Sequence, residues 1–134
     1  MKLADTSVIV AAAQSWNPAN SLASAALNSC RKAISHTLFE SYSVLTRSPS
    51  PFRIDAKTAL AWLDAQFTSE IALPNNSHLE TLSRLHDLGI SGGAVYDGII
   101  ALTALDNRAT LITLDKRASG TYSKCGVKFR LLSV

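Results

Sequence analysis

Four acidic residues stand in surroundings where an uncompensated carboxylate is costly. Asp5 follows an apolar opening stretch, and Asp97 begins the most apolar segment of the chain. Glu40 lies in the middle of an amphipathic pattern, and Asp115 follows the apolar run 111–114. Each acid alone can be a helix cap, an exposed side chain or, for Glu40, a partner of Arg47. Four converging carboxylates repel one another, and Mg²⁺ or Mn²⁺, which prefer oxygen ligands, would remove that repulsion.

The elements that would position these acids alternate between short strands and helices. We expect strands over residues 2–5, 31–35, 70–73 (closed by Pro74), 110–114 and 127–132. We expect helices capped by Thr6 or Ser7 and by Asp55, the latter over 56–66, and further helices over 19–28, 37–46, 77–88 and 94–105. This alternation predicts a mainly parallel α/β sheet with helices on both faces. Functional side chains gather at the carboxyl ends of such strands, where Asp5 and Asp115 are expected.

Length and composition indicate one compact domain, residues 1–134, with 47% apolar and 17% charged residues. No apolar run approaches the roughly 18 residues that a membrane-spanning helix needs. Asp5 also interrupts the opening stretch that would otherwise resemble a signal peptide, so we expect a cytoplasmic protein without membrane attachment. Cys30 and Cys125 lack the spacing of metal ligands and are expected to be free thiols.

The charge distribution favours a polyanionic partner. Net charge is +3, and setting the four acids aside leaves 13 basic against 6 acidic residues. Candidate phosphate contacts are Lys116 and Arg117, directly after Asp115, and Arg31, Lys32 and Arg47; each is equally well explained as solvated surface. The histidines at 36, 78 and 86 show no metal-ligand spacing and are expected at the surface or in local structure.

Four blocks of sequence, taken together, carry a family resemblance. They are D-T-S at 5–7, H-T-L-F-E-S-Y-S-V-L-T-R at 36–47, G-G-A-V-Y-D-G-I-I-A at 92–101 and L-I-T-L-D-K-R-A at 111–118. In order and spacing, over essentially the whole chain, they resemble the PIN-domain family and, more narrowly, the VapC-type toxins of bacterial toxin–antitoxin pairs.

The resemblance implies a single-domain α/β/α sandwich and a metal-dependent endoribonuclease. Asp5, Glu40, Asp97 and Asp115 would then form an acidic quartet around Mg²⁺ or Mn²⁺, with Ser7 and Thr113 as supporting hydroxyl residues. Thr6 matches a position that varies more. The resemblance also implies a homodimer, an RNA substrate and a small VapB-like antitoxin whose tail enters the acidic groove.

One departure from the family pattern and several alternatives stay open. Lys116 and Arg117 stand where many relatives carry a further acid, so Asp115 would bind a metal either directly or through water. A PIN nuclease for RNA maturation is one alternative, although an accessory RNA-binding domain is missing. A catalytically idle scaffold for RNA or protein would not need all four acids. A phosphate-transferring hydrolase with Asp5 as nucleophile is disfavoured, because Ser7 occupies the place of its second aspartate.

Overall fold

The computed structural model describes residues 1–73 and 77–134 as an alternation of strands and helices. Its elements are β1 (Lys2–Ala4), α1 (Thr6–Ala13), α2 (Asn20–Leu27), β2 (Lys32–Ile34), α3 (Ser35–Arg47), α4 (Ala56–Gln66), β3 (Ser69–Ile71), α5 (His78–Asp87), α6 (Ala94–Asp106), β4 (Thr110–Thr113), the 3₁₀-helix η1 (Lys116–Ala118), α7 (Ser119–Cys125) and β5 (Phe129–Leu131). Within these ranges, no helix has the length and apolar character needed to cross a membrane.

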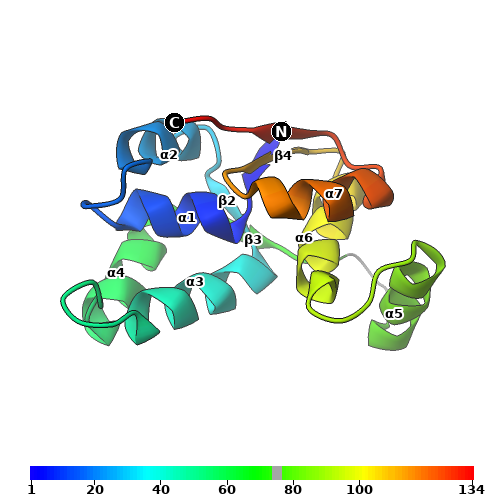
Figure 1. Cartoon of the computed structure of the whole chain (residues 1–134), viewed down its shortest axis with the longest axis horizontal. Coiled ribbons are helices and arrows are strands. Elements are labelled where there is room, and N and C mark those ends of the chain that lie inside the picture. Colours follow the sequence, from blue (N-terminus) through cyan, green and yellow to red (C-terminus); the bar gives the residue numbers. More distant parts are fainter. Residues whose placement is uncertain (74–76) are drawn as a thin grey trace.

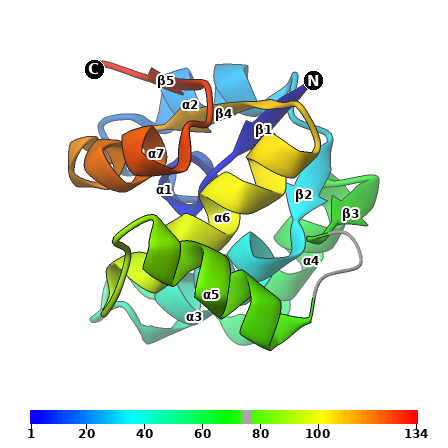
Figure 2. The same ribbon diagram turned by 90° about the vertical axis from the view of Figure 1, so that its right-hand side faces the viewer.

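The strands lie in the order β3-β2-β1-β4-β5, and every ladder between the described strands is parallel. β4 pairs with β1 through Leu3↔Leu111 and with β5 through Leu111↔Phe129. β2 pairs with β3 through Ile34↔Ile71, and it lies beside β1 without a hydrogen-bonded ladder (Figure 2). The predicted parallel sheet is therefore confirmed.

Side chains alternate between the two faces of the sheet and build two cores, as the strand period requires. Leu3 and Leu111 belong to the core formed with α5, α6 and α7. Their neighbours Ala4 and Ile112 belong to the core formed with α1, α2 and α4. In Figure 1 the strands run between α1 and α2 on one side and α6 on the other. This arrangement is the expected α/β/α sandwich.

Of the two helix starts for which the sequence predicted a cap, one needs a correction. Asp55 caps α4 as predicted, but α1 is capped by Asp5 and not by Thr6 or Ser7. Asp5 has extended backbone angles, and its side chain accepts from the amides of Ser7 and Val8. A cap must precede the helix to reach these free amides, so Thr6 and Ser7 are already inside it. The predicted closure of β3 by Pro74 lies outside the described residues.

The segment between β4 and β5, to which the sequence assigned no helix, contains η1 and α7. Parallel neighbours need a crossover connection of about a dozen residues, usually helical, which is the physical reason for these elements. α7 ends at Gly126, whose positive φ of 75° terminates a helix without strain. Tyr122 and Cys125, three residues apart, turn the buried face of α7 towards the core. Cys125 and Cys30 are both buried and free, as predicted.

Candidate active site

Asp5 lies at the carboxyl end of β1 and is only 2% exposed. Its Oδ1 accepts hydrogen bonds from the amides of Ser7 (3.0 Å) and Val8 (3.4 Å) and a short one from the Ser7 hydroxyl. Its Oδ2 accepts from the Tyr122 hydroxyl at 2.7 Å. Burial raises the pKa of Asp5, and the hydroxyls of Ser7, Thr113 and Tyr122 oppose that shift. The protein itself therefore holds this carboxylate in one orientation.

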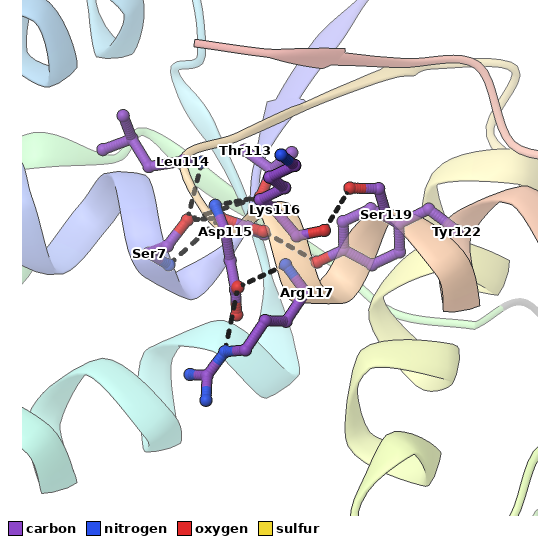
Figure 3. Close-up of polar contacts among 9 residues, drawn as sticks. Ser7, Thr113, Leu114, Asp115, Lys116, Arg117, Ser119 and Tyr122 are labelled. Carbon is purple, nitrogen blue, oxygen red and sulfur yellow. Dashed lines mark hydrogen bonds and ion pairs between the residues drawn. The ribbon is translucent and has the colours of Figure 1, made fainter. Parts of the chain in front are cut away.

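Ser7 and Thr113 tie the end of β4 to the first turn of α1 (Figure 3). The Ser7 hydroxyl accepts from the amide of Leu114 at 2.9 Å and lies 3.5 Å from the Thr113 hydroxyl. Thr113 in turn accepts from the amide of Asp115 at 3.0 Å. Both predicted supporting residues thus lie between Asp5 and Asp115 and fix the backbone that carries these two acids.

Glu40 projects from the second turn of α3, with one third of its side chain exposed. Its Oε1 accepts from the Thr6 hydroxyl at 2.9 Å. The Nε2 of His36, one turn earlier, lies 3.4 Å from the same oxygen but makes no well-aligned hydrogen bond within the described residues. The His36 ring is parallel to that of Tyr96, with 5.5 Å between centroids. Glu40 is therefore anchored to α1 and lies near α6, the helix of Asp97.

Asp97 lies half-buried in the first turn of α6, and its environment differs from that of Asp5. Its pKa is raised to about 6, first by burial and then by the negative charges of Glu40, Asp115 and Asp5. The charge of Arg117 opposes the shift, whereas no hydrogen bond from the described residues does so. The other three predicted acids therefore act electrostatically on Asp97, which, unlike Asp5, accepts no hydrogen bond from the described residues.

Asp115 follows β4 and caps η1, accepting from the amide of Arg117 at 2.9 Å. The Nε of Arg117 also lies 3.7 Å from Asp115 Oδ1, on a side chain that is 95% exposed. Figure 3 shows this guanidinium beside the Asp115 carboxylate. Lys116 is exposed as well. Arg117 thus lies beside Asp115, and Lys116 is its exposed neighbour in η1.

The other three basic candidates are not brought to this cluster. Arg31 and Lys32 are exposed at the amino end of β2, whereas the acids gather at the carboxyl ends of the strands. Arg47 lies in the last turn of α3, about two turns beyond Glu40, and donates to the Ser43 hydroxyl at 3.3 Å. The Glu40–Arg47 pair considered as an alternative is therefore not formed.

The sequence did not reveal the contact between Tyr122 and Asp5. Tyr122 lies 117 positions from Asp5 along the chain and belongs to α7, a helix that the sequence did not predict. Gly126 at the end of that helix, together with the need for a crossover between parallel strands, is the signal that could have predicted α7.

The donor set fits a hard divalent cation by its chemistry, because it consists of carboxylate oxygens with mutual repulsion. Within residues 1–73 and 77–134, no group of three acidic, histidine or cysteine side chains is arranged to hold a metal ion. Glu40 accepts from Thr6 through Oε1 and Asp115 accepts from Arg117 through Oδ1. Each of these two acids keeps its second carboxylate oxygen without a partner among the described residues.

Comparisons with known proteins identify the family of this chain. The PIN domain family model matches residues 2–124. Ribonuclease VapC40 of Mycobacterium tuberculosis (strain ATCC 25618 / H37Rv) is 37% identical over 130 residues, which are 96% of this chain and 97% of that protein. Ribonuclease VapC27 of the same strain is 41% identical over 92 residues, 69% of this chain and 67% of that protein.

A likeness to a solved structure supports the fold alone. The crystal structure of FitAcB from Neisseria gonorrhoeae matches with a TM-score of 0.61 and 18% sequence identity, over 96% of each chain. The family match, over residues 2–124, covers the segments that carry all four acids. This chain belongs to the PIN-domain family, and within that family it groups with the VapC ribonucleases.

Proposed function

We propose that this protein is a metal-dependent endoribonuclease that acts as the toxin of a VapBC-like toxin–antitoxin pair. It hydrolyses RNA phosphodiesters at the acidic quartet Asp5, Glu40, Asp97 and Asp115. The names of its relatives support a ribonuclease. The observation that carries the proposal is Asp97, a half-buried carboxylate that accepts no hydrogen bond from the described residues and is repelled by three other acids.

Each acid has a distinct part in holding Mg²⁺ or Mn²⁺. Asp97 provides the uncompensated charge, and Asp5 provides a carboxylate that is already oriented. Glu40 and Asp115 complete the oxygen donors from α3 and from the end of β4. Such an ion, when bound, supplies Lewis-acid stabilisation of phosphate charge and activates water. Ser7 and Thr113 act through the backbone, because their hydroxyls accept from the amides of Leu114 and Asp115.

RNA would approach the quartet along the rim that carries Lys116 and Arg117. Both side chains are exposed, and Arg117 already lies 3.7 Å from Asp115. Lysine and arginine at such a rim contact phosphates and not base edges, so they contribute affinity more than sequence preference. Arg31, Lys32 and Arg47 have no part in this path, because they lie away from the acids.

Protein partners follow from the same assignment: a small VapB-like antitoxin and a second copy of the chain, in the cytoplasm. An apolar surface between α3 and α4 supports binding of a protein. It surrounds a cavity of about 490 Å³ and includes Phe39, 79% exposed, and Leu60, 61% exposed. The exposure of these two side chains leaves apolar area available for burial against a partner.

Metal removal tests the proposal. EDTA should stop RNA cleavage, and Mg²⁺ or Mn²⁺ should restore it. Ca²⁺ should restore little, because its longer and more flexible coordination misplaces the reacting groups. Asp97→Asn should lower the cleavage rate at least about a hundredfold, more than the usual cost of losing a group that only supports a ligand.

Asp87→Asn is the matched control, since Asp87 is an exposed aspartate at the end of α5. This variant should cleave RNA like the unsubstituted protein. Full activity in EDTA, or normal cleavage by Asp97→Asn, would contradict the proposal and favour a metal-independent nuclease or an idle scaffold.

A further inference from the structure

We infer that Tyr122 is a positioning residue that reserves one oxygen atom of Asp5, Oδ2, for the metal ion. The inference rests on the proposed function and adds a part to it that neither the family match nor the names of the relatives assign. It is carried by the hydrogen bonds of a single buried carboxylate.

The two oxygens of Asp5 differ in how many donors they accept. A carboxylate oxygen offers about two lone-pair positions. Oδ1 accepts from the amides of Ser7 and Val8 and from the Ser7 hydroxyl, so its positions are filled. Oδ2 accepts from Tyr122 among the described residues and keeps one position free. Asp5 can therefore offer a cation one oxygen atom, and that atom is Oδ2.

Tyr122 is held firmly enough to set the direction of this remaining position. Its side chain is fully buried, and its ring packs edge-on against the Phe129 ring, with 5.8 Å between the ring centroids. α7 packs on α6, which carries Asp97, and follows η1, which Asp115 caps. The helix that supplies Tyr122 is thus fixed to the elements of two other acids, so the orientation of Asp5 is coupled to their positions.

A phenol suits this place better than a cationic donor. Lysine or arginine would neutralise Asp5 and oppose binding of a divalent ion at the same oxygen. The Tyr122 hydroxyl is an uncharged donor at neutral pH. Tyr122 orients the carboxylate and leaves its negative charge available to the metal.

Mn²⁺ binding in the absence of RNA tests the inference, with free Mn²⁺ measured by electron paramagnetic resonance. Tyr122→Phe keeps the ring and removes only the hydroxyl. Its Mn²⁺ dissociation constant should rise about 10- to 100-fold, the usual effect of removing a group that orients a metal ligand. Tyr42→Phe is the matched control, because it removes the hydroxyl of an exposed tyrosine on α3 that donates nothing to Asp5. It should leave Mn²⁺ affinity within about twofold.

A second measurement needs no substitution. In the unsubstituted protein, Mg²⁺ should shift the NMR resonances of the Tyr122 ring with the midpoint of metal binding. Wild-type affinity in Tyr122→Phe, equal weakening by Tyr42→Phe, or ring resonances insensitive to Mg²⁺ would each overturn the inference alone. If the unsubstituted protein bound no Mn²⁺, the proposed function itself would fail, and this inference with it.

Discussion

The two sides of the acidic site treat their carboxylates in opposite ways. On one side, Asp5 is buried and accepts hydrogen bonds from Ser7, Val8 and Tyr122. On the other, Asp97 is half-buried, accepts none from the described residues, and is repelled by the remaining acids. The first arrangement fixes geometry without a cation, and the second provides the electrostatic drive to bind one. A site of this kind needs both, because a fully compensated cluster would have little affinity for a cation and a fully uncompensated one would not stay in place.

Truncating each acid in turn tests most directly whether the two sides of the site differ. Asp5→Ala removes the cap of α1 and leaves the Tyr122 hydroxyl unpaired, so we expect a loss of about 2–3 kcal/mol in the free energy of unfolding. Asp97→Ala removes repulsion and should raise that free energy by about 1 kcal/mol. Urea unfolding in EDTA at pH 7.5 measures both. Equal effects of the two substitutions would mean that the two sides do not differ.

The pH dependence of the free energy of unfolding reports on the ionisation of Asp97. The pKa of Asp97 is about 6 in the folded protein against an ordinary value of 3.8. Well below pH 4 the group is protonated in both states and costs nothing. As the pH rises from about 4 to 6, the unfolded state releases the proton while the folded state keeps it, so the free energy of unfolding falls and then levels off above pH 6.

Asp97→Asn should therefore be more stable than the unsubstituted protein at pH 8, by about 1–2 kcal/mol after allowing for partial solvent screening. This advantage should disappear as the pH falls to 4. Urea unfolding in EDTA from pH 4 to 8 gives the difference directly, and a difference independent of pH would show that Asp97 is not the strained carboxylate.

The smallest expected effect concerns the rim beside Asp115. Replacing Lys116 and Arg117 by alanine in an Asp97→Asn background should weaken RNA binding across sequences and flatten its salt dependence. Each lost phosphate contact lowers the log–log slope by roughly 0.7 for a single strand, so the pair should lower it by about 1.4.

Affinity measured over a salt series checks this prediction. The matched control is Arg31→Ala with Lys32→Ala, two adjacent basic residues at the opposite edge of the sheet. The control pair should leave the slope unchanged. A slope that depends on Arg31 and Lys32 and not on Lys116 and Arg117 would move the RNA path away from the acids.

The sequence pattern predicted the fold class and the placement of two of the acids for one physical reason. Alternating strands and helices force a parallel sheet, and the strands before Asp5 and Asp115 then end at the same edge. The prediction assigned no helix to the segment after Asp115, because its residues are mostly polar and only Tyr122 and Cys125 mark a buried face. It named Lys116 and Arg117 first and Arg31, Lys32 and Arg47 as further candidates, and the structure places Arg117 beside Asp115 but Arg31 and Lys32 at the amino end of β2.

The identities and spacing of the acids, and hence the kind of cation that suits them, were determined by the sequence itself. The tertiary structure decided how far the charge of each acid is compensated by hydrogen-bond donors. Whether a carboxylate is compensated depends on donors that packing brings to it, and the decisive donor to Asp5 comes from a tyrosine 117 positions away. No local pattern encodes that contact, because it exists only once α7 has crossed over between β4 and β5 and packed against α6.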